Sequence, residues 1–284
     1  YAISTDSRAI DGSSNLYLAL KGERFDGHDF VLKAFENGAG LAIVDSDSLE
    51  AVLNGLSSEP KSSAPPVVSV PNTLAAYQGL ARLYLRKSSA KVIAITGSSG
   101  KTTTKEMTAA ATSARRVHKS LANENNEIGV PKTILSMPAD SEILILEMGM
   151  RGLGQIAQLA ACGLPDIGVI TCAGSAHIEL LGSLENIAKA KCELFAALDA
   201  ERGYAIIGDG SEHLISQAKR DFAGRIEIAP ALEIVGVDSV GTTFKIPGSA
   251  NLGQEFFVKA HGRVLLEDAW CAVAAARGAG LTDS

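Results

Sequence analysis

Residues 94–103 read Ala94-Ile95-Thr96-Gly97-Ser98-Ser99-Gly100-Lys101-Thr102-Thr103. The apolar run that ends at Ile95 is typical of a buried strand, and the residues from Lys105 onward favour a helix. Glycines between a strand and a helix let backbone N–H groups approach an anion, and the helix N-terminus adds partial positive charge. Lys101 adds a full charge, and the hydroxyl of Thr102 can reach Mg²⁺. The turn therefore predicts a phosphate site, with a plain strand-to-helix turn as the alternative.

The motif is shorter than the general phosphate-loop pattern, because Ile95 stands where that pattern has its first glycine. The remaining residues expected to hold phosphates are Gly97, Ser98, Ser99, Gly100, Lys101, Thr102 and Thr103. The strand before them and the helix after them are the structural context that the motif needs.

Length and composition describe a globular protein. A chain of 284 residues suits two domains, and 46% hydrophobic with 20% charged residues is ordinary for a packed core. The net charge of −6 argues against a nucleic-acid partner, and no apolar run is long enough to insert into a membrane. The four cysteines lack C-x-x-C spacing, which indicates reduced thiols in a cytoplasm instead of zinc ligands or disulfides.

From Lys91 onward, short apolar runs alternate with helical patterns. The expected strands are Val92–Ile95, Ile143–Leu146, Ile167–Thr171 and Tyr204–Ile207, and the expected helices are Lys101–Ser113, Pro131–Ser136, Gly154–Ala161, Leu184–Leu198, Ser211–Lys219 and Leu265–Ala279. This alternation predicts a mostly parallel sheet flanked by helices, with a β-rich extension from Arg225 to Lys259. The preceding segment has short strands at 15–20, 41–44 and 67–70, helices at 30–37 and 72–87, and a proline-rich loop at 57–66. The expected fold is α/β, with a small N-terminal domain (1–74) and a central phosphate-loop domain (75–284).

Two further candidates follow strand ends. Glu147 ends one predicted strand and His177 lies just beyond another, so both should meet the glycine turn at the carboxyl edge of the sheet. An acid beside a phosphate loop is a usual Mg²⁺ ligand, and a histidine there can also bind a metal. A solvated carboxylate and a histidine without chemistry are the alternatives.

Lys191 lies in the middle of the apolar stripe of its predicted helix, whereas Lys189 falls on the opposite, wet face. Burial disfavours the charged amine, so the pKa of Lys191 should fall. A neutral amine can react with CO₂ to form a carbamate, which would bind a metal as an anion. Extension of the lysine to solvent, or pairing with a carboxylate such as Glu147, is equally open.

Polar loops supply the remaining candidates. Asn125 and Asn126 could bind phosphate oxygens or metal-bound water, or could cap the helix that follows. Arg151 could pair with an anionic substrate group. In the first domain, the charged and glycine-containing loops suit an anionic ligand; their candidate residues are Ser7, Arg8, Asp26, Gly27 and His28.

These residues together resemble the Mur ligase family of peptidoglycan synthesis. The resemblance runs from Ser4 to about Ile207 and is fainter beyond. Its motifs are Thr96-Gly97-Ser98-Ser99-Gly100-Lys101-Thr102-Thr103-Thr104-Lys105-Glu106, Asn125-Asn126-Glu127-Ile128-Gly129-Val130-Pro131, Glu147-Met148-Gly149, His177-Ile178-Glu179 and Ala188-Lys189-Ala190-Lys191. The opening Asp6-Ser7-Arg8 and the Asp26-Gly27-His28 loop resemble the members that add D-alanyl-D-alanine to UDP-N-acetylmuramoyl-tripeptide (UDP-MurNAc-tripeptide).

The resemblance implies an ATP-dependent amide-bond ligase that forms an acyl phosphate on the tripeptide carboxylate. It implies that Lys101 and the turn hold ATP, with Asn126 near the phosphates. Thr102 and Glu147 would hold one Mg²⁺, and His177 with a carbamylated Lys191 would support a second. The first-domain loops would hold the UDP-sugar. The expected catalytic residues are Lys101, His177 and Lys191. The expected partners are the small molecules UDP-MurNAc-tripeptide and D-alanyl-D-alanine. We also expect the protein to be a monomer in a bacterial cytoplasm.

The chain departs from the family pattern near its end. Val264 follows Gly262-Arg263 where the family usually has a histidine, and Asp268 stands where the family usually has an asparagine. The resemblance also implies a third, C-terminal domain that closes over ATP, and the chain stops at Ser284, about where that domain should begin. Poor ligation by this chain alone is therefore expected. A related ligase with another acceptor, including a folylpolyglutamate-type ligase, and a non-catalytic nucleotide-binding module are the alternatives.

Overall fold

The structure is a computed structural model that describes residues 2–12, 15–22, 25–56, 66–174, 178–245, 255–259 and 261–281. Contacts divide the chain into two compact units, Tyr1–Leu83 and Tyr84–Ser284. This division falls inside helix α3 (Thr73–Lys87), and the domain boundary predicted after residue 74 falls at the start of the same helix. That boundary stays a prediction.

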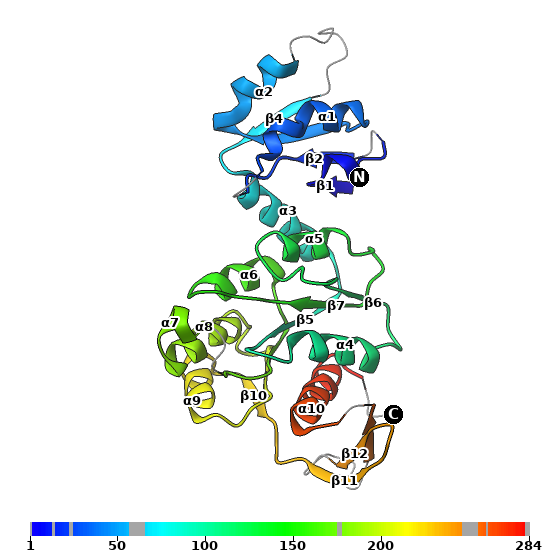
Figure 1. Cartoon of the computed structure of the whole chain (residues 1–284), viewed down its shortest axis with the longest axis vertical. Coiled ribbons are helices and arrows are strands. Elements are labelled where there is room, and N and C mark those ends of the chain that lie inside the picture. The colour runs from blue at the N-terminus through cyan, green and yellow to red at the C-terminus, as the bar shows by residue number, and fades with distance from the viewer. Residues whose placement is uncertain are drawn as a thin grey trace. The chain divides into compact units, whose positions relative to one another are not determined.

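The first unit is a parallel four-stranded sheet with helices packed on it (Figure 1). Its strands lie in the order β1 (Ala2–Ser4), β2 (Asn15–Leu18), β3 (Leu41–Asp45) and β4 (Val67–Val70). Its helices are η1 (Ser7–Ala9), η2 (Gly27–Phe30) and η3 (Ser46–Ser48), which are 3₁₀, and α1 (Val31–Glu36) and α2 (Leu49–Leu56). Tyr17 and Val44 of the sheet pack with Val31 and Val52 of the helices in one apolar core.

The second unit is built on a parallel six-stranded sheet. The strand order is β10 (Arg225–Ile228), β9 (Tyr204–Ile207), β8 (Ile167–Ile170), β5 (Lys91–Thr96), β7 (Ile143–Glu147) and β6 (Val117–Lys119). The chain leaves β5 for the edge strand β6, returns to β7, and then crosses to β8 on the other side of β5. Such a reversal opens a crevice at the carboxyl ends of the strands, which is where parallel α/β sheets bind ligands.

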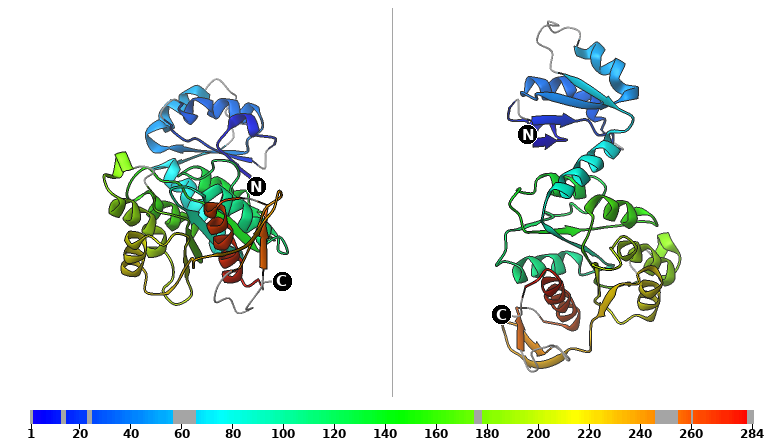
Figure 2. Two further views of the ribbon diagram at one scale, coloured as in Figure 1. Left: turned by 60° about the horizontal axis from the view of Figure 1, so that its bottom comes forward. Right: turned by 180° about the vertical axis from the view of Figure 1, so that it is seen from behind.

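Helices cover both faces of this sheet (Figures 1 and 2). They are α4 (Lys101–Ala111), α5 (Gly129–Leu135), α6 (Gln155–Gly163), α7 (Ile178–Leu181), α8 (Leu184–Ala196), α9 (Glu212–Asp221) and α10 (Arg263–Gly278). On one face, Ile93 and Ile145 share a buried cluster with Trp270 of α10, which also contacts α4. On the other face, Gly168 of β8 allows Leu194 and Phe195 of α8 to approach the sheet closely. Alternate strand residues are buried on both faces, which is why the strands are apolar throughout.

A small antiparallel sheet packs against α10. It contains β11 (Glu233–Val237), β12 (Thr242–Lys245) and β13 (Glu255–Val258) in that order. Phe244 is buried in the same cluster as Trp270, and its ring stacks on Phe256 with centroids 5.7 Å apart. The predicted β-rich extension is thus confirmed, with the qualification that β10 belongs to the main sheet.

The α/β prediction is confirmed, and the predicted strands and helices lie within a few residues of the observed ones. Four short elements, β1, β6, α2 and α7, were not predicted, because three to eight residues carry too little periodicity. Residues 57–65 of the predicted proline-rich loop lie outside the described residues. Of the helices in the described part of the chain, none combines the length and the apolar character needed to cross a bilayer.

Candidate functional site

The glycine turn lies between the end of β5 and the start of α4, as predicted. A Cβ on Gly97 would overlap the hydroxyl of Thr171, which follows β8. Gly100 has a φ of +78°, a left-handed angle that glycine adopts without strain, and a Cβ there would overlap the carboxyl group of Asp268. Both glycines are therefore required, and they bring the N-terminus of α4 to the carboxyl edge of the sheet, where it can receive an anion.

Two side chains in the first turn of α4, those of Lys101 and Thr102, make hydrogen bonds at the candidate site. Lys101 Nζ donates to the carbonyl oxygen of Gly97 at 2.9 Å, so the ammonium group lies against the turn. Thr102 Oγ1 donates to Glu147 Oε2, also at 2.9 Å. The turn, the lysine and the hydroxyl–carboxylate pair thus form one cluster from residues far apart in sequence.

Glu147 ends β7 and is 2% exposed, so its carboxylate is buried and not solvated. Besides the bond from Thr102, it accepts one from Asn125 Nδ2 at 3.0 Å. Its backbone N–H donates to Ser120 Oγ at 3.1 Å. The predicted meeting of this strand end with the glycine turn is confirmed.

Sequence reasoning gave no role to Lys105, which the structure places beside Glu147. Lys105 is 1% exposed, and its Nζ lies 3.4 Å from Glu147 Oε2. Helical spacing could have indicated that Lys105 belongs to the site. Lys105 follows Thr102 by three residues and Lys101 by four, so it shares their face of α4.

Lys191 is 1% exposed in α8, whereas Lys189 is exposed, so the predicted helix orientation is confirmed. Burial, together with the charge of Lys101, lowers the pKa of Lys191 to about 8. The alternative pairing of Lys191 with Glu147 is not seen, because the lysine beside that carboxylate is Lys105. A carbamate on Lys191 stays a prediction.

Three predicted residues of the second unit remain, and they are Asn126, Arg151 and His177. Asn126 Oδ1 accepts hydrogen bonds from the backbone N–H groups of Ile128 and Gly129 at the start of α5. This side chain therefore caps the helix, which was the alternative to a role in phosphate binding. Arg151 is exposed in the turn that follows β7. His177 lies outside the described residues.

Asp268 is buried directly beneath the glycine turn, at 3% exposure. The hydroxyl of Thr104 donates to its Oδ1 at 3.1 Å. Burial raises the pKa of Asp268 to about 6, and the nearby charge of Glu267 acts in the same direction. The aspartate at position 268, where the family pattern has asparagine, therefore puts a carboxyl group against Gly100.

The first unit has a hollow of about 570 Å³ that brings together three of its five predicted residues, Ser7, Arg8 and Gly27. Arg8 holds Asp6 through two hydrogen bonds of 2.9 and 2.8 Å, yet its side chain remains largely exposed. The lining also includes Tyr17, Phe25, Phe30 and Lys33. The hollow thus combines cations with aromatic rings, which suits a ligand with anionic and planar parts.

Asp26 and His28 support the loop beside this hollow. His28 is buried, and its Nδ1 lies 2.5 Å from Asp26 Oδ1. Its Nε2 accepts from the backbone N–H of Asp45 at 2.9 Å. Both ring nitrogens therefore bind the unit itself, which makes His28 a support for the loop that carries Gly27. A Cβ on Gly27 would lie 2.7 Å from backbone atoms of Leu20, so this glycine is required.

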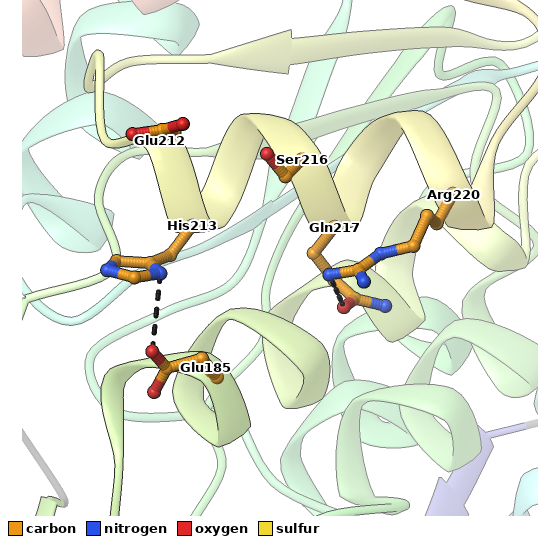
Figure 3. A pocket seen from close by; sticks show the side chains of 6 residues that line it. All are labelled: Glu185, Glu212, His213, Ser216, Gln217 and Arg220. Atoms are coloured by element: carbon orange, nitrogen blue, oxygen red, sulfur yellow. Dashed lines mark hydrogen bonds and ion pairs between the residues drawn. The ribbon is translucent and has the colours of Figure 1, made fainter.

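A second hollow, of about 260 Å³, lies between α8 and α9 (Figure 3). Figure 3 shows the ring of His213 facing Glu185, at 3.4 Å, and Arg220 turned onto Gln217, to which it donates at 3.0 Å. These ionic groups are exposed, and exposed ion pairs contribute little free energy. Among the described residues that line this hollow, none is a predicted site residue.

Fold and site together define a phosphate-loop α/β protein, with its glycine turn and hydroxyl–carboxylate pair at the carboxyl edge of a parallel sheet. Family comparison agrees: the Mur ligase middle domain matches residues 95–276, and the Mur ligase family catalytic domain matches residues 1–85. The chain belongs to the Mur ligase family.

Its relatives include two enzymes named UDP-N-acetylmuramoyl-tripeptide--D-alanyl-D-alanine ligase. The one from Bacillus subtilis is 38% identical over 280 residues, which cover 97% of this chain and 58% of the relative. The one from Synechocystis is 44% identical over 224 residues, which cover 78% of this chain and 47% of the relative. This chain thus spans about half the length of these relatives.

Solved structures agree with these relatives. MurF from Thermotoga maritima, in complex with ADP, matches 99% of this chain with a TM-score of 0.81 and 28% identity, over 64% of its own length. MurF from Acinetobacter baumannii matches 99% of this chain with a TM-score of 0.79 and the same identity, over 60% of its own length. Escherichia coli FolC matches with a TM-score of 0.54 at 18% identity, which shows a shared fold alone.

Proposed function

We propose that this chain binds ATP and UDP-MurNAc-tripeptide for the ligase reaction that adds D-alanyl-D-alanine. The observation that carries the proposal is the cluster of Lys101, Thr102 and Glu147 at the glycine turn. The names of the relatives and the ADP complex of the Thermotoga structure support the choice of substrate and nucleotide.

The residues at the turn fit a nucleotide phosphate chain. The two glycines remove side chains where the backbone must approach the phosphates, and Lys101 lies against the turn. An ammonium group there would release its bond to Gly97 and pair with phosphate oxygens instead. Ser99 and Thr103 would contribute backbone N–H groups, whereas the backbone N–H of Ser98 already donates to the carbonyl oxygen of Cys172 at 3.0 Å and holds the turn in place.

The residues also fit Mg²⁺. A hydroxyl and a carboxylate are hard oxygen donors, and Thr102 and Glu147 already lie within hydrogen-bond distance of each other. The ion would neutralise charge on the phosphates. Asn125 would hold the other carboxylate oxygen in place. His177 is proposed as a ligand of a second ion from its sequence position alone.

Lys191 fits the proposed carbamate. A buried amine with a pKa of about 8 has a substantial neutral fraction near neutral pH, and the neutral amine is the form that reacts with CO₂. Its nitrogen attacks the carbon of CO₂ and loses a proton, which leaves an anionic carbamate. Positive charge from Lys101 favours that anion.

The hollow of the first unit is the proposed UDP-sugar site. Arg8 and Lys33 offer cations for a diphosphate, and Phe25, at 73% exposure, offers a ring for the base. Asp26 and His28 would act by holding Gly27 at its edge. Arg151 is proposed to contact an anionic group of the substrate.

In the proposed reaction, a carboxylate oxygen of the tripeptide attacks the terminal phosphorus of ATP, and the bond to the ADP oxygen breaks. The neutral amine of D-alanyl-D-alanine then attacks the acyl carbon and loses a proton, and phosphate leaves as the amide forms. The first step joins two anions and the second expels an anionic phosphate, so Lys101 and the Mg²⁺ that Thr102 and Glu147 would hold serve chiefly by neutralising charge.

The test is calorimetric titration of the chain with Mg-ADP and, separately, with UDP-MurNAc-tripeptide, followed by an assay of phosphate release that depends on D-alanyl-D-alanine. Binding of both ligands is expected, and Lys101→Met should lose the nucleotide while the exposed control Lys189→Met should not. Failure to bind either ligand would refute the proposal. Binding of ADP with a folate acceptor, or with no acceptor, would favour a related ligase or a non-catalytic nucleotide-binding module.

We also propose a monomer in a bacterial cytoplasm. No disulfide joins the four cysteines, which are Cys162, Cys172, Cys192 and Cys271, and reduced thiols are usual in a cytoplasm. Sedimentation analysis tests the monomer.

A further inference from the structure

Lys105 is a buried cation that the proposed reaction does not use. Its Nζ lies 3.4 Å from Glu147 Oε2 and 3.7 Å from Glu106 Oε1. Lys105 and Glu147 are both almost fully buried, so solvent screens their attraction little. Glu106 is half exposed and pairs with Lys119, and so belongs to the outer end of this charge series.

The carboxylate of Glu147 already has a complete set of partners. Thr102 and Asn125 donate to its two oxygens, and the ammonium group of Lys105 balances its charge. A divalent ion entering here would meet a carboxylate whose charge is already neutralised, and it would be repelled by the lysine.

The described residues also offer few other metal ligands near Glu147. Within the part of the chain that the structure describes, no group of three or more His, Cys, Asp or Glu side chains comes together to hold a metal. Mg²⁺ prefers six oxygen ligands and is usually bound by one or two carboxylates together with substrate phosphates. The negative charge needed to overcome the lysine must therefore arrive with the ligand.

We propose that Lys105 is an internal counter-ion that sets the metal affinity of Glu147, so that a divalent cation enters with the nucleotide phosphates and not before them. Lys105 acts through Glu147 and is a positioning residue. The inference rests on the proposed function, because it takes the nucleotide and metal at this turn as given.

Free Mn²⁺ is the probe, measured by electron paramagnetic resonance at pH 8 without nucleotide. Lys105→Met keeps the length of the side chain and removes its charge. Repulsion between a single and a double charge about 6 Å apart, even at the dielectric of water, corresponds to about tenfold in affinity. Lys105→Met should therefore bind free Mn²⁺ at least about tenfold more tightly than the unmodified chain.

Two controls separate charge from structure. Lys105→Arg keeps the charge and should bind Mn²⁺ as weakly as the unmodified chain, and Lys189→Met removes an exposed charge and should do the same. A lysine that only holds Glu147 in place would give the opposite result, because its loss would weaken metal binding. Equal or weaker Mn²⁺ binding by Lys105→Met would overturn the inference.

The unmodified chain gives a second test that does not depend on a variant folding. Its Mn²⁺ affinity should rise at least about tenfold when ADP is added, since the phosphates then supply the missing charge. Equal affinity with and without ADP would overturn the inference while leaving the proposed function intact. Absence of ADP binding would overturn both.

Discussion

Replacement of Asp268 by asparagine should stabilise the second unit, and by an amount that grows with pH. The pKa of this buried carboxyl group is raised from 3.8 to about 6. A raised pKa means that the folded protein holds the proton more tightly than the unfolded chain does, so stability is lost as pH rises from about 4 to about 6. The shift of about two units corresponds to about 3 kcal/mol above pH 6.

The measurement is urea unfolding followed by the fluorescence of Trp270. This residue is the one tryptophan in the sequence, and it lies buried two positions from Asp268 on α10. Subtracting the free energy of unfolding of the unmodified chain from that of Asp268→Asn removes contributions from other titrating groups. Because part of the shift is already expressed at pH 4.5, the difference should increase by about 2 kcal/mol between pH 4.5 and pH 7.5.

The exposed Asp199 provides a matched control in the same unit. Its pKa is lowered from the ordinary 3.8, chiefly by its hydrogen bond from Arg202, so this carboxyl group is largely ionised in both the folded and the unfolded chain above pH 4.5. The difference curve of Asp199→Asn should therefore be flat over the same range. A flat curve for Asp268→Asn, or one that falls with pH, would refute the argument that burial holds the proton on Asp268.

Three further predictions concern the glycine turn and α8. Gly97→Ala should destabilise the second unit by about 1–3 kcal/mol in the same unfolding assay, because the new Cβ would overlap the hydroxyl of Thr171. The control Gly152→Ala places its Cβ in open space and should change the free energy of unfolding by less than about 0.5 kcal/mol. Equal effects of the two substitutions would contradict the steric reasoning. Lys101→Met should weaken ADP binding at least about tenfold by calorimetry, since a charged hydrogen bond is lost, and unchanged affinity would remove Lys101 from the site. With ¹³CO₂, the chain should show a carbamate carbonyl resonance that is absent from a Lys191→Met variant, and its absence from the unmodified chain would contradict carbamylation.

Local sequence was informative wherever one element carried the whole signal. The strand, glycines and helix around residues 94–103 are contiguous, so their arrangement could be predicted directly. The phase of α8 was also predictable, because helical periodicity alone places Lys191 inside and Lys189 outside. The short strand β6 was missed, because it is held by its pairing with the distant strand β7, in which Val117 lies opposite Ile143.

The sequence by itself determined the α/β class, the phosphate turn and the burial of Lys191, since each follows from contacts within about a dozen residues. Only the tertiary structure decided which groups meet at that turn. Strand order sets Glu147 beside Thr102, and α10 brings Asp268 beneath Gly100 from more than 160 residues away. The physical reason is that burial and Coulomb energy depend on distance in space, so the charge states at this site are properties of the packed fold.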